Sequence, residues 1–498
     1  MAEEQQNTTA PVLEKKNTSF KGDVFRLVGG TVIAQIIGII TIPIISRFFG
    51  PEAYGTAALF TAITSVLAVV ACWRYELAIV IPEKDEEAAS VFFVSLFATV
   101  VTTLLVSLLT AFWAESIFKL LKSEVLLPYK WFIPLFVFLQ GLYMTFNYWN
   151  SRTKRFNRVA AAGIINSTTT RVINIITGFL GHASGGAMVK ALTAGQAAAS
   201  GIIGTQIIKN DSSFLKTNFN FREILASIKR YKKFPLISTW SAFLNTLSAN
   251  LPAMLLTYYF SSTAAGLFAF GHRLLTYPLS IIGSSMSQVF FQRSSEALHE
   301  NKLNKLTEKV FIQLITLGLY PTLLLMIVAP EIFGVVFGNK WIEAGVFSQI
   351  LAPWIFFNFI CSPLTTISEL FNKQEIGLCF NALLIATRYF SLFIGGLLKQ
   401  IYLGLVIYSL TGAITYIIWS AVLLKLACAS RRIIFKNSVN ELCKVLLFLI
   451  PVLLLKSSIY NSLVVILSTT GFVTFLYYLY QIKNNAEIHS LVLNKIKK

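Results

Sequence analysis

Among the basic residues within or beside apolar segments, where a charge requires an explanation, five are candidates for binding a ligand. Arg171, Arg273 and Arg388 are the deepest by sequence, whereas Arg47 and Lys190 lie nearer the ends of their segments. On insertion scales, a charged side chain at the centre of a bilayer costs about 2.5–3.5 kcal/mol. Because a guanidinium group binds phosphate through two parallel hydrogen bonds, these residues predict a water-filled cationic cavity for an anionic headgroup.

Structural explanations compete with this binding hypothesis. A long basic side chain can extend along its helix to the lipid headgroups, which accounts equally well for Arg47 and Lys190. A helix–helix ion pair is the alternative for the deeper arginines. Acidic partners are scarce, however, because the apolar segments contain almost no Asp or Glu.

Arg74 and Glu76 lie where the second apolar segment ends and an acidic loop, residues 73–88, begins. Their opposite charges are expected to pair. We assign them to a gating or structural motif at the membrane boundary rather than to the binding cavity.

The elements that position these residues are apolar segments long enough to cross a membrane. The 498 residues are 55% hydrophobic and 13% charged, whereas a soluble domain carries about 25% charged residues. A membrane-spanning helix needs about 20 apolar residues. The sequence therefore predicts an all-α polytopic membrane protein. We expect about fourteen spans, at residues 25–46, 54–72, 89–113, 129–149, 159–180, 187–208, 235–258, 264–291, 310–337, 343–368, 376–398, 402–427, 440–456 and 461–480.

The distribution of basic residues predicts the orientation of these spans. With the N-terminus inside, 29 of the 42 Lys and Arg residues fall in cytoplasmic loops or tails and six fall outside. This asymmetry follows the positive-inside rule and predicts that both termini are cytoplasmic. A net charge of +19 would suggest nucleic acid in a soluble protein. Here the charges lie in short loops between spans, so nucleic-acid binding is excluded.

The two halves of the chain resemble each other. Phe49, Ala53 and Gly55 recur 211 residues later as Phe260, Ala264 and Gly266, and the dipeptide Thr170–Arg171 recurs as Thr387–Arg388. Two parallel six-helix repeats suit a two-lobed transporter. The predicted organisation is a cytoplasmic tail (1–24), an N-terminal lobe (25–208), a linker (209–234), a C-terminal lobe (235–428), two extra helices (440–480) and a second tail (481–498).

The linker has a pattern of its own. Apolar residues recur at helical spacing from Phe221 to Tyr231, opposite several Lys and Arg residues. This pattern predicts a short amphipathic helix in the headgroup layer.

No cofactor or metal site is expected. The five cysteines and four histidines are scattered, and the chain has no GxxxxGK[ST] motif for ATP. The first 23 residues are polar and lack the apolar core of a signal peptide.

Two motifs carry a resemblance to a known family. They are Arg47–Gly55 (RFFGPEAYG) and Trp73–Pro82 (WRYELAIVIP), which is followed by DEEA at residues 85–88. At these motifs the chain resembles the polysaccharide-exporter (O-antigen flippase) family of the MOP superfamily.

The resemblance implies a function without covalent chemistry. It implies a transporter that flips undecaprenyl-pyrophosphate-linked oligosaccharides across the bacterial cytoplasmic membrane through a cationic cavity between two lobes. Arg47 and Arg273 stand where the related lipid II flippase has functional arginines. The implied partners are membrane lipids, a polysaccharide polymerase and a chain-length regulator.

Three alternatives differ in what the sequence should contain. A MATE-type cation-coupled drug exporter predicts a buried carboxylate in the first lobe, which we do not find in the sequence. A major-facilitator transporter predicts a Gly- and Arg-rich loop after the second span, where this chain is acidic. A polysaccharide polymerase or ligase predicts a large outer loop, but the longest here has about fifteen residues.

Overall fold

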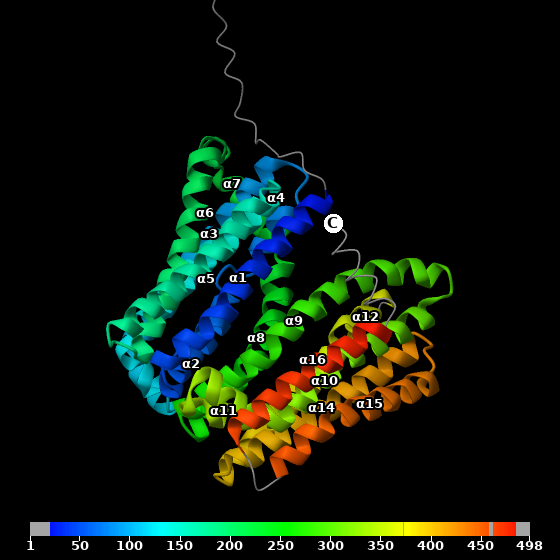
Figure 1. Ribbon diagram of the computed structural model, residues 1–498. Helices are drawn as coiled ribbons and strands as arrows, with labels where there is room; N and C mark the ends of the chain where they lie inside the picture. Colours follow the sequence, from blue (N-terminus) through cyan, green and yellow to red (C-terminus); the bar gives the residue numbers. More distant parts are fainter. Residues whose placement is uncertain (1–19, 372, 458–461, 485–498) are drawn as a thin grey trace, which may run out of the picture. The chain divides into compact units, whose positions relative to one another are not determined.

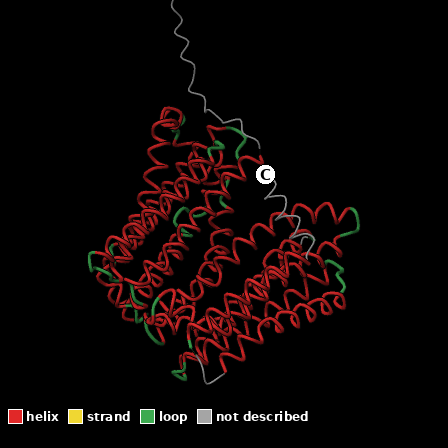
Figure 2. The backbone as a smooth tube through the Cα atoms, viewed as in Figure 1, coloured by secondary structure: helices red, strands yellow, loops and turns green. Residues whose placement is uncertain are grey.

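The computed structural model describes residues 20–371, 373–457 and 462–484 as helices joined by short turns (Figures 1 and 2). The predicted tails 1–24 and 481–498 therefore lie largely outside the described residues. Each predicted span overlaps one long helix, and the span 343–368 also covers the short helices η5 (Ser362–Thr365) and α12 (Thr366–Leu370). The long helices are α1 (Phe20–Phe48), α2 (Pro51–Ala68), α3 (Asp85–Leu120), α4 (Phe132–Arg152), α5 (Phe156–Phe179), α6 (Gly185–Thr217), α8 (Thr239–Tyr259), α9 (Ser262–His299), α10 (Leu303–Phe337), α11 (Ile342–Cys361), α13 (Gln374–Leu397), α14 (Ile401–Leu426), α15 (Arg431–Ser457) and α16 (Leu463–Asn484).

Eight helical stretches in the described part are long and apolar enough to cross a membrane. They belong to α1, α3, α10, α13, α14, α15 and α16, and to the stretch Asn339–Leu370 that contains α11. The chain is therefore a multi-pass membrane protein with an all-helical fold. The remaining predicted spans, such as α5 and α6, contain more Gly, Thr and Asn, so the count of fourteen stays a prediction.

The chain divides into two compact units. Unit 1 holds the described residues up to Phe270 together with Arg388–Ile401, and unit 2 holds Gly271–Thr387 and the chain from Tyr402 onward. The helices α9 and α13 contribute residues to both. The predicted six-helix lobes, 25–208 and 235–428, follow the sequence repeat and remain a prediction.

The core of unit 1 is built around large aromatic side chains between small residues. Trp149 of α4 is fully buried, and its ring centroid lies 5.1 Å from that of Phe92 on α3. Ala162 and Ala199 are buried in the same cluster. Small residues let helix backbones approach closely, and the aromatic rings fill the remaining space.

Unit 2 is centred on α10. The ring of Tyr320 stacks on that of Tyr477 with centroids 4.0 Å apart, and its hydroxyl lies 2.9 Å from Thr474 Oγ1. These contacts join α16 to α10. The two extra helices beyond the sequence repeat are thus anchored to unit 2.

The region between residues 209 and 234 differs from the expected loop. The helix α6 continues to Thr217 instead of ending at 208, and α7 occupies Phe221–Arg230. Ile224 of α7 is buried against Tyr75 and Val94, while Phe221 and Leu225 remain exposed. The amphipathic helix therefore forms and docks on α3, and contact with lipid headgroups stays a prediction.

Candidate functional site

Arg171 is a buried cation in the body of unit 1. It lies on α5 and is 8% exposed. A Cβ atom added to Gly38 of α1 would lie 3.5 Å from Nη2 of Arg171. The absence of a side chain at Gly38 therefore gives the guanidinium room against the backbone of α1.

Buried amides and hydroxyls lie near Arg171 in the sequence and in the adjoining helix α6. Asn166 Nδ2 donates to Gln196 Oε1 over 2.7 Å. Thr170 Oγ1, Asn174 Oδ1 and Gln196 Nε2 are buried without a hydrogen-bond partner. Unsatisfied buried polar atoms are costly in a native protein. These unpartnered polar atoms suit a site that receives water or a polar ligand.

Arg388 is held in a similar way by the first helix of the second repeat. Its Nη1 atom donates to the carbonyl oxygen of Ser248 over 3.2 Å and to Ser248 Oγ over 2.9 Å. Position 249, next to Ser248, is 211 residues after Gly38. Arg171 and Arg388 thus make matching contacts with α1 and α8. Whether the two arginines share one cavity stays a prediction.

A second contact also recurs in both repeats. A Cβ atom on Gly178 of α5 would lie 2.7 Å from the ring of Phe48, which ends α1. A Cβ atom on Gly396 of α13 would lie 2.3 Å from the ring of Tyr259, which ends α8. Phe48 and Tyr259 are 211 residues apart. In each repeat a glycine makes space for the aromatic residue that ends the first helix.

The helix α2 closely approaches the first turn of α9 within unit 1. A Cβ atom on Gly55 would lie 1.7 Å from the Ser262 carbonyl oxygen, and one on Gly266 would lie 1.9 Å from the Pro51 carbonyl oxygen. Gly55 pairs with Gly266, and Pro51 with Ser262, at the offset of 211. This is the reciprocal contact that two elements make across a two-fold axis.

Arg273 belongs to unit 2 and is partly buried on α9. Its Nε atom donates to the hydroxyl of Tyr277, one turn further along the helix. The guanidinium carbon also lies 4.8 Å from the centre of the Tyr277 ring. A cation over an aromatic face is stabilised by the ring quadrupole. Tyr277 therefore orients this guanidinium on its own helix.

The remaining two cations of the predicted cavity are exposed. Arg47 lies in the last turn of α1, and Lys190 lies in the second turn of α6. Exposure agrees equally well with a cavity wall and with a side chain that reaches the headgroups. Their part in binding stays a prediction.

The expected pair of Arg74 and Glu76 forms. Arg74 Nη1 lies 3.4 Å from Glu76 Oε1, and the Glu76 side chain is 1% exposed. Glu76 lies in a short 3₁₀ helix, η1 (Tyr75–Val80), between α2 and α3. Burial raises the pKa of the Glu76 carboxyl to about 7, although the positive charge of Arg74 opposes this rise.

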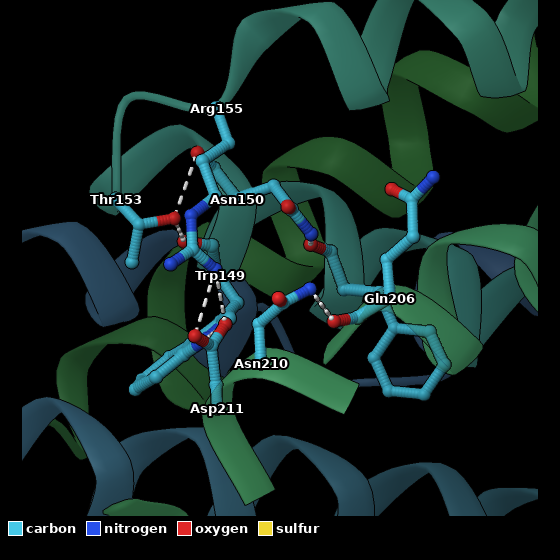
Figure 3. A network of polar contacts seen from close by, with 8 residues as sticks. Trp149, Asn150, Thr153, Arg155, Gln206, Asn210 and Asp211 are labelled. Carbon is cyan, nitrogen blue, oxygen red and sulfur yellow. Dashed lines mark hydrogen bonds and ion pairs between the residues drawn. The ribbon is translucent and has the colours of Figure 1, made fainter. Parts of the chain in front are cut away.

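Asp211 is a buried carboxylate that the sequence analysis missed (Figure 3). Both of its oxygens lie 2.7 Å from Arg155 Nη1, and Oδ2 also accepts a hydrogen bond of 3.0 Å from Trp149 Nε1. Asp211 is 1% exposed. It ties the turn between α4 and α5 to the last turns of α6. The local sequence around 211 is polar, so nothing in it signals burial.

Glu76 and Asp211 bear on one expectation. The sequence analysis found no carboxylate deep within the predicted spans of the first lobe, and both of these residues lie outside those spans, so that expectation stays a prediction. Both carboxylates lie at the ends of apolar segments, and folding buries them there. Asp211 is neutralised by Arg155, whereas Glu76 Oε2 is buried without a hydrogen-bond partner.

The family description "Polysaccharide biosynthesis protein" matches residues 44–345 of the chain. The match covers more than half of the sequence and includes Arg74, Glu76, Arg171 and Arg273. The chain belongs to this family. The family resemblance predicted from residues 47–88 is thereby confirmed.

This polysaccharide biosynthesis protein is also similar to individual proteins. It is 22% identical over 337 residues to the succinoglycan biosynthesis transport protein ExoT of Rhizobium meliloti (strain 1021), covering 66% of this chain. The match spans 65% of ExoT, slightly less than two thirds of that relative.

Two solved structures show the same fold as this polysaccharide biosynthesis protein. The lipid II flippase MurJ in an inward closed conformation matches with a TM-score of 0.70, 13% identity and coverage of 91% of this chain and 98% of MurJ. An inward-facing multidrug resistance MATE transporter of the MOP superfamily matches with a TM-score of 0.62, 15% identity and coverage of 81% and 98%. The chain therefore has the fold of MOP-superfamily transporters.

Proposed function

We propose that this protein is a flippase for undecaprenyl-pyrophosphate-linked oligosaccharide. The cargo is an O-antigen, capsule or exopolysaccharide repeat unit, moved from the cytoplasmic to the outer leaflet of the bacterial cytoplasmic membrane. The observation that carries the proposal is the pair of arginines, Arg171 and Arg388, on matching helices of a polysaccharide biosynthesis protein. The likeness to ExoT and the fold shared with MurJ support it.

The proposed mechanism is alternating access between two six-helix lobes, with both termini in the cytoplasm. The pyrophosphate and the sugars enter a basic cavity, while the polyprenyl tail stays in the lipid. Arg273, Arg171 and Arg388 supply the cationic groups, and Arg47 and Lys190 line its edge. No bond is made or broken, so the mechanism requires no nucleophile or general base. A polysaccharide polymerase would then receive the flipped unit.

The environments of the arginines support this role. A pyrophosphate oxygen is a stronger hydrogen-bond acceptor than the hydroxyls of Ser248 and Tyr277 that now contact Arg388 and Arg273. Both of these contacts are hydrogen bonds to neutral hydroxyl groups. A substrate phosphate that replaces them therefore gains a charge-assisted hydrogen bond.

The test is reconstitution of the purified protein in liposomes with labelled undecaprenyl-pyrophosphate oligosaccharide. We expect the labelled headgroup to move to the opposite leaflet without chain growth. Formation of polymer would show an enzyme instead, and no movement in the wild type would reject the flippase.

Three substitutions at two positions test the arginines. Arg273→Ala should lower the flipping rate at least tenfold. Arg273→Lys should recover part of this rate, because lysine keeps the positive charge but cannot bind phosphate through two parallel hydrogen bonds. Arg171→Met should abolish flipping without lowering the melting temperature, since methionine removes a buried charge and keeps its volume. Lys119→Met, at an exposed lysine, is the control. Full activity of both Arg273→Ala and Arg171→Met would reject the cationic cavity.

A second candidate is a cation-coupled exporter of the MATE type. The buried carboxylate of Glu76 and the fold shared with a MATE transporter favour it. The same liposomes, loaded with a fluorescent cationic drug, separate the two functions. Drug movement without movement of the lipid-linked saccharide would favour the exporter.

A further inference from the structure

Glu76 is a buried carboxyl group with an incomplete set of partners. Its side chain is 1% exposed. The oxygen Oε2 has no hydrogen-bond partner, and the nearest guanidinium atom, Arg74 Nη1, lies 3.4 Å from Oε1. This distance permits an ion pair but exceeds that of a normal charge-assisted hydrogen bond. The negative charge of Glu76 is therefore poorly stabilised where it lies.

The backbone holds Glu76 in this position. Trp73 and Arg74 are consecutive non-glycine residues with φ of 51° and 61°, a left-handed conformation that such residues seldom adopt. Cys72 anchors the same turn, because its sulfur lies 3.3 Å from Thr99 Oγ1 on α3 and 3.3 Å from the Gly141 carbonyl oxygen on α4. Strained backbone that the surrounding helices enforce is a common feature of functional sites.

The charged and titratable groups around Glu76 leave it with one counter-charge. Arg74 is that group, and Cys72 and Tyr148 of α4 are the further titratable groups that interact with Glu76 electrostatically. From α4 and α3, Arg152 and Asp85 pair with each other at 2.7 Å. In the first turn of α3, Glu87 pairs with Arg230, while Glu86 is exposed. The segment Phe234–Ser238, which also packs here, contains no titratable side chain.

We propose that Glu76 binds and releases a proton during transport, with Arg74 as its counter-charge, so that the proton is the coupling ion of the flippase. The proposal rests on the proposed function. The side chain of Arg74 is 24% exposed, so water reaches the ion pair from one side. The deprotonated carboxylate attracts Arg74 and holds the turn between α2 and α3. The protonated carboxyl releases Arg74, and the strained turn then keeps only its other contacts, such as those of Cys72 with Thr99 and Gly141.

The energetics of the site agree with a proton that exchanges near neutral pH. Burial raises the pKa of the Glu76 carboxyl to about 7. A group with this pKa changes its protonated fraction about tenfold between one pH unit below and one above it. Glu83 is an exposed carboxylate of the same loop and provides a control.

Infrared spectroscopy of the purified protein tests proton binding without any substrate. We expect the carbonyl band of a protonated carboxyl to appear on acidification with a midpoint near pH 7. Glu76→Gln should remove this band, and Glu83→Gln should not. Arg74→Gln should shift the midpoint to higher pH, because the positive charge that favours the carboxylate is lost. A purely structural pair would not produce a band that titrates near pH 7.

Flipping in liposomes tests coupling. The wild-type rate should change about tenfold across the pH interval around the midpoint, and an imposed pH gradient should drive net movement. Glu76→Gln, which resembles the protonated form in shape, should fold, and its rate should not depend on pH. Glu83→Gln should retain the wild-type pH profile.

The outcomes distinguish this inference from the proposed function. Absence of the infrared band in the wild type, or an unchanged pH profile in Glu76→Gln, would overturn the proton site. A wild type that moves no lipid-linked saccharide would reject the flippase, and the infrared titration would still decide whether Glu76 binds the proton.

Discussion

The two ends of unit 1 are held together by different interactions. At the end that carries η1 (Tyr75–Val80) and α7, ion pairs join neighbouring elements: Asp211 with Arg155, and Asp85 with Arg152. At the end that carries the turn between α1 and α2, glycines let helices approach closely, as Gly55 and Gly266 do. The first end is therefore held by ion pairs, and the second by close packing of helices at glycines.

The difference has a physical consequence for motion. Separating a buried ion pair exposes two unsatisfied charges to a poorly solvating environment, which is expensive. Separating a glycine contact between helices loses only dispersion energy and leaves no unpaired group. We therefore expect the glycine end to open more readily during transport, and the ion-paired end to remain a rigid block.

Asp211→Asn should produce the largest loss of stability. It removes the negative charge of a buried ion pair, and removing one partner of such a pair costs about 3–5 kcal/mol. The midpoint of thermal unfolding in detergent measures the effect, with the exposed Glu83→Gln as the control. Equal stability of the two variants would show that the ion-paired end is not a rigid block.

Gly55→Ala and Gly266→Ala should each cost about 1–3 kcal/mol, because the added methyl group meets a backbone carbonyl that cannot turn away. Gly163→Ala is the matched control, since a Cβ atom there meets nothing within 4 Å. The same unfolding assay applies. The two variants should behave alike, and a large difference between them would break the equivalence of the repeats.

Gly178→Ala and Gly396→Ala should have smaller effects, near about 1 kcal/mol. Their added methyl groups meet the Cβ, Cγ and one ring atom of Phe48 and of Tyr259, so the whole aromatic side chain must shift, which it does more readily than a helix backbone carbonyl. Larger losses here than at Gly55 would show that the aromatic contacts, and not the helix crossing, determine the packing of this end.

Glu87→Gln should have the smallest effect. Glu87 pairs with Arg230, whose side chain is 66% exposed, and exposed ion pairs contribute little to stability. Any change in the unfolding midpoint should disappear when salt is added, because the Debye length shortens. A large effect that persists in salt would mean that the ion-paired end extends to α7.

The sequence predicted the positions of the helices well. Length and apolarity place α3 and α10 without reference to any partner, because each segment must satisfy its own backbone hydrogen bonds in lipid. The prediction was weaker at the end of α6, which continues to Thr217. Its last turns are polar, and the contact of Asp211 with Arg155 ties them to the turn between α4 and α5.

The candidate site was predicted in part. Arg171 and Arg388 were recognised because a charge within an apolar run stands out, and the pairing of Arg74 with Glu76 follows from their spacing. The sequence did not reveal that Glu76 is buried with one oxygen unpartnered, because this depends on how α3 and α4 pack over a strained turn.

The sequence by itself determined the membrane-spanning helical class, the family and the repeat. Composition indicates the class, local motifs indicate the family, and the spacing of matching residues indicates the repeat. Only the tertiary structure decided which groups meet. It placed Gly55 against the turn that holds Gly266, Arg388 against Ser248, and Asp211 against an arginine 56 residues away. Such contacts depend on the rotation of each helix about its axis, which is fixed by packing against its neighbours and not by its own residues.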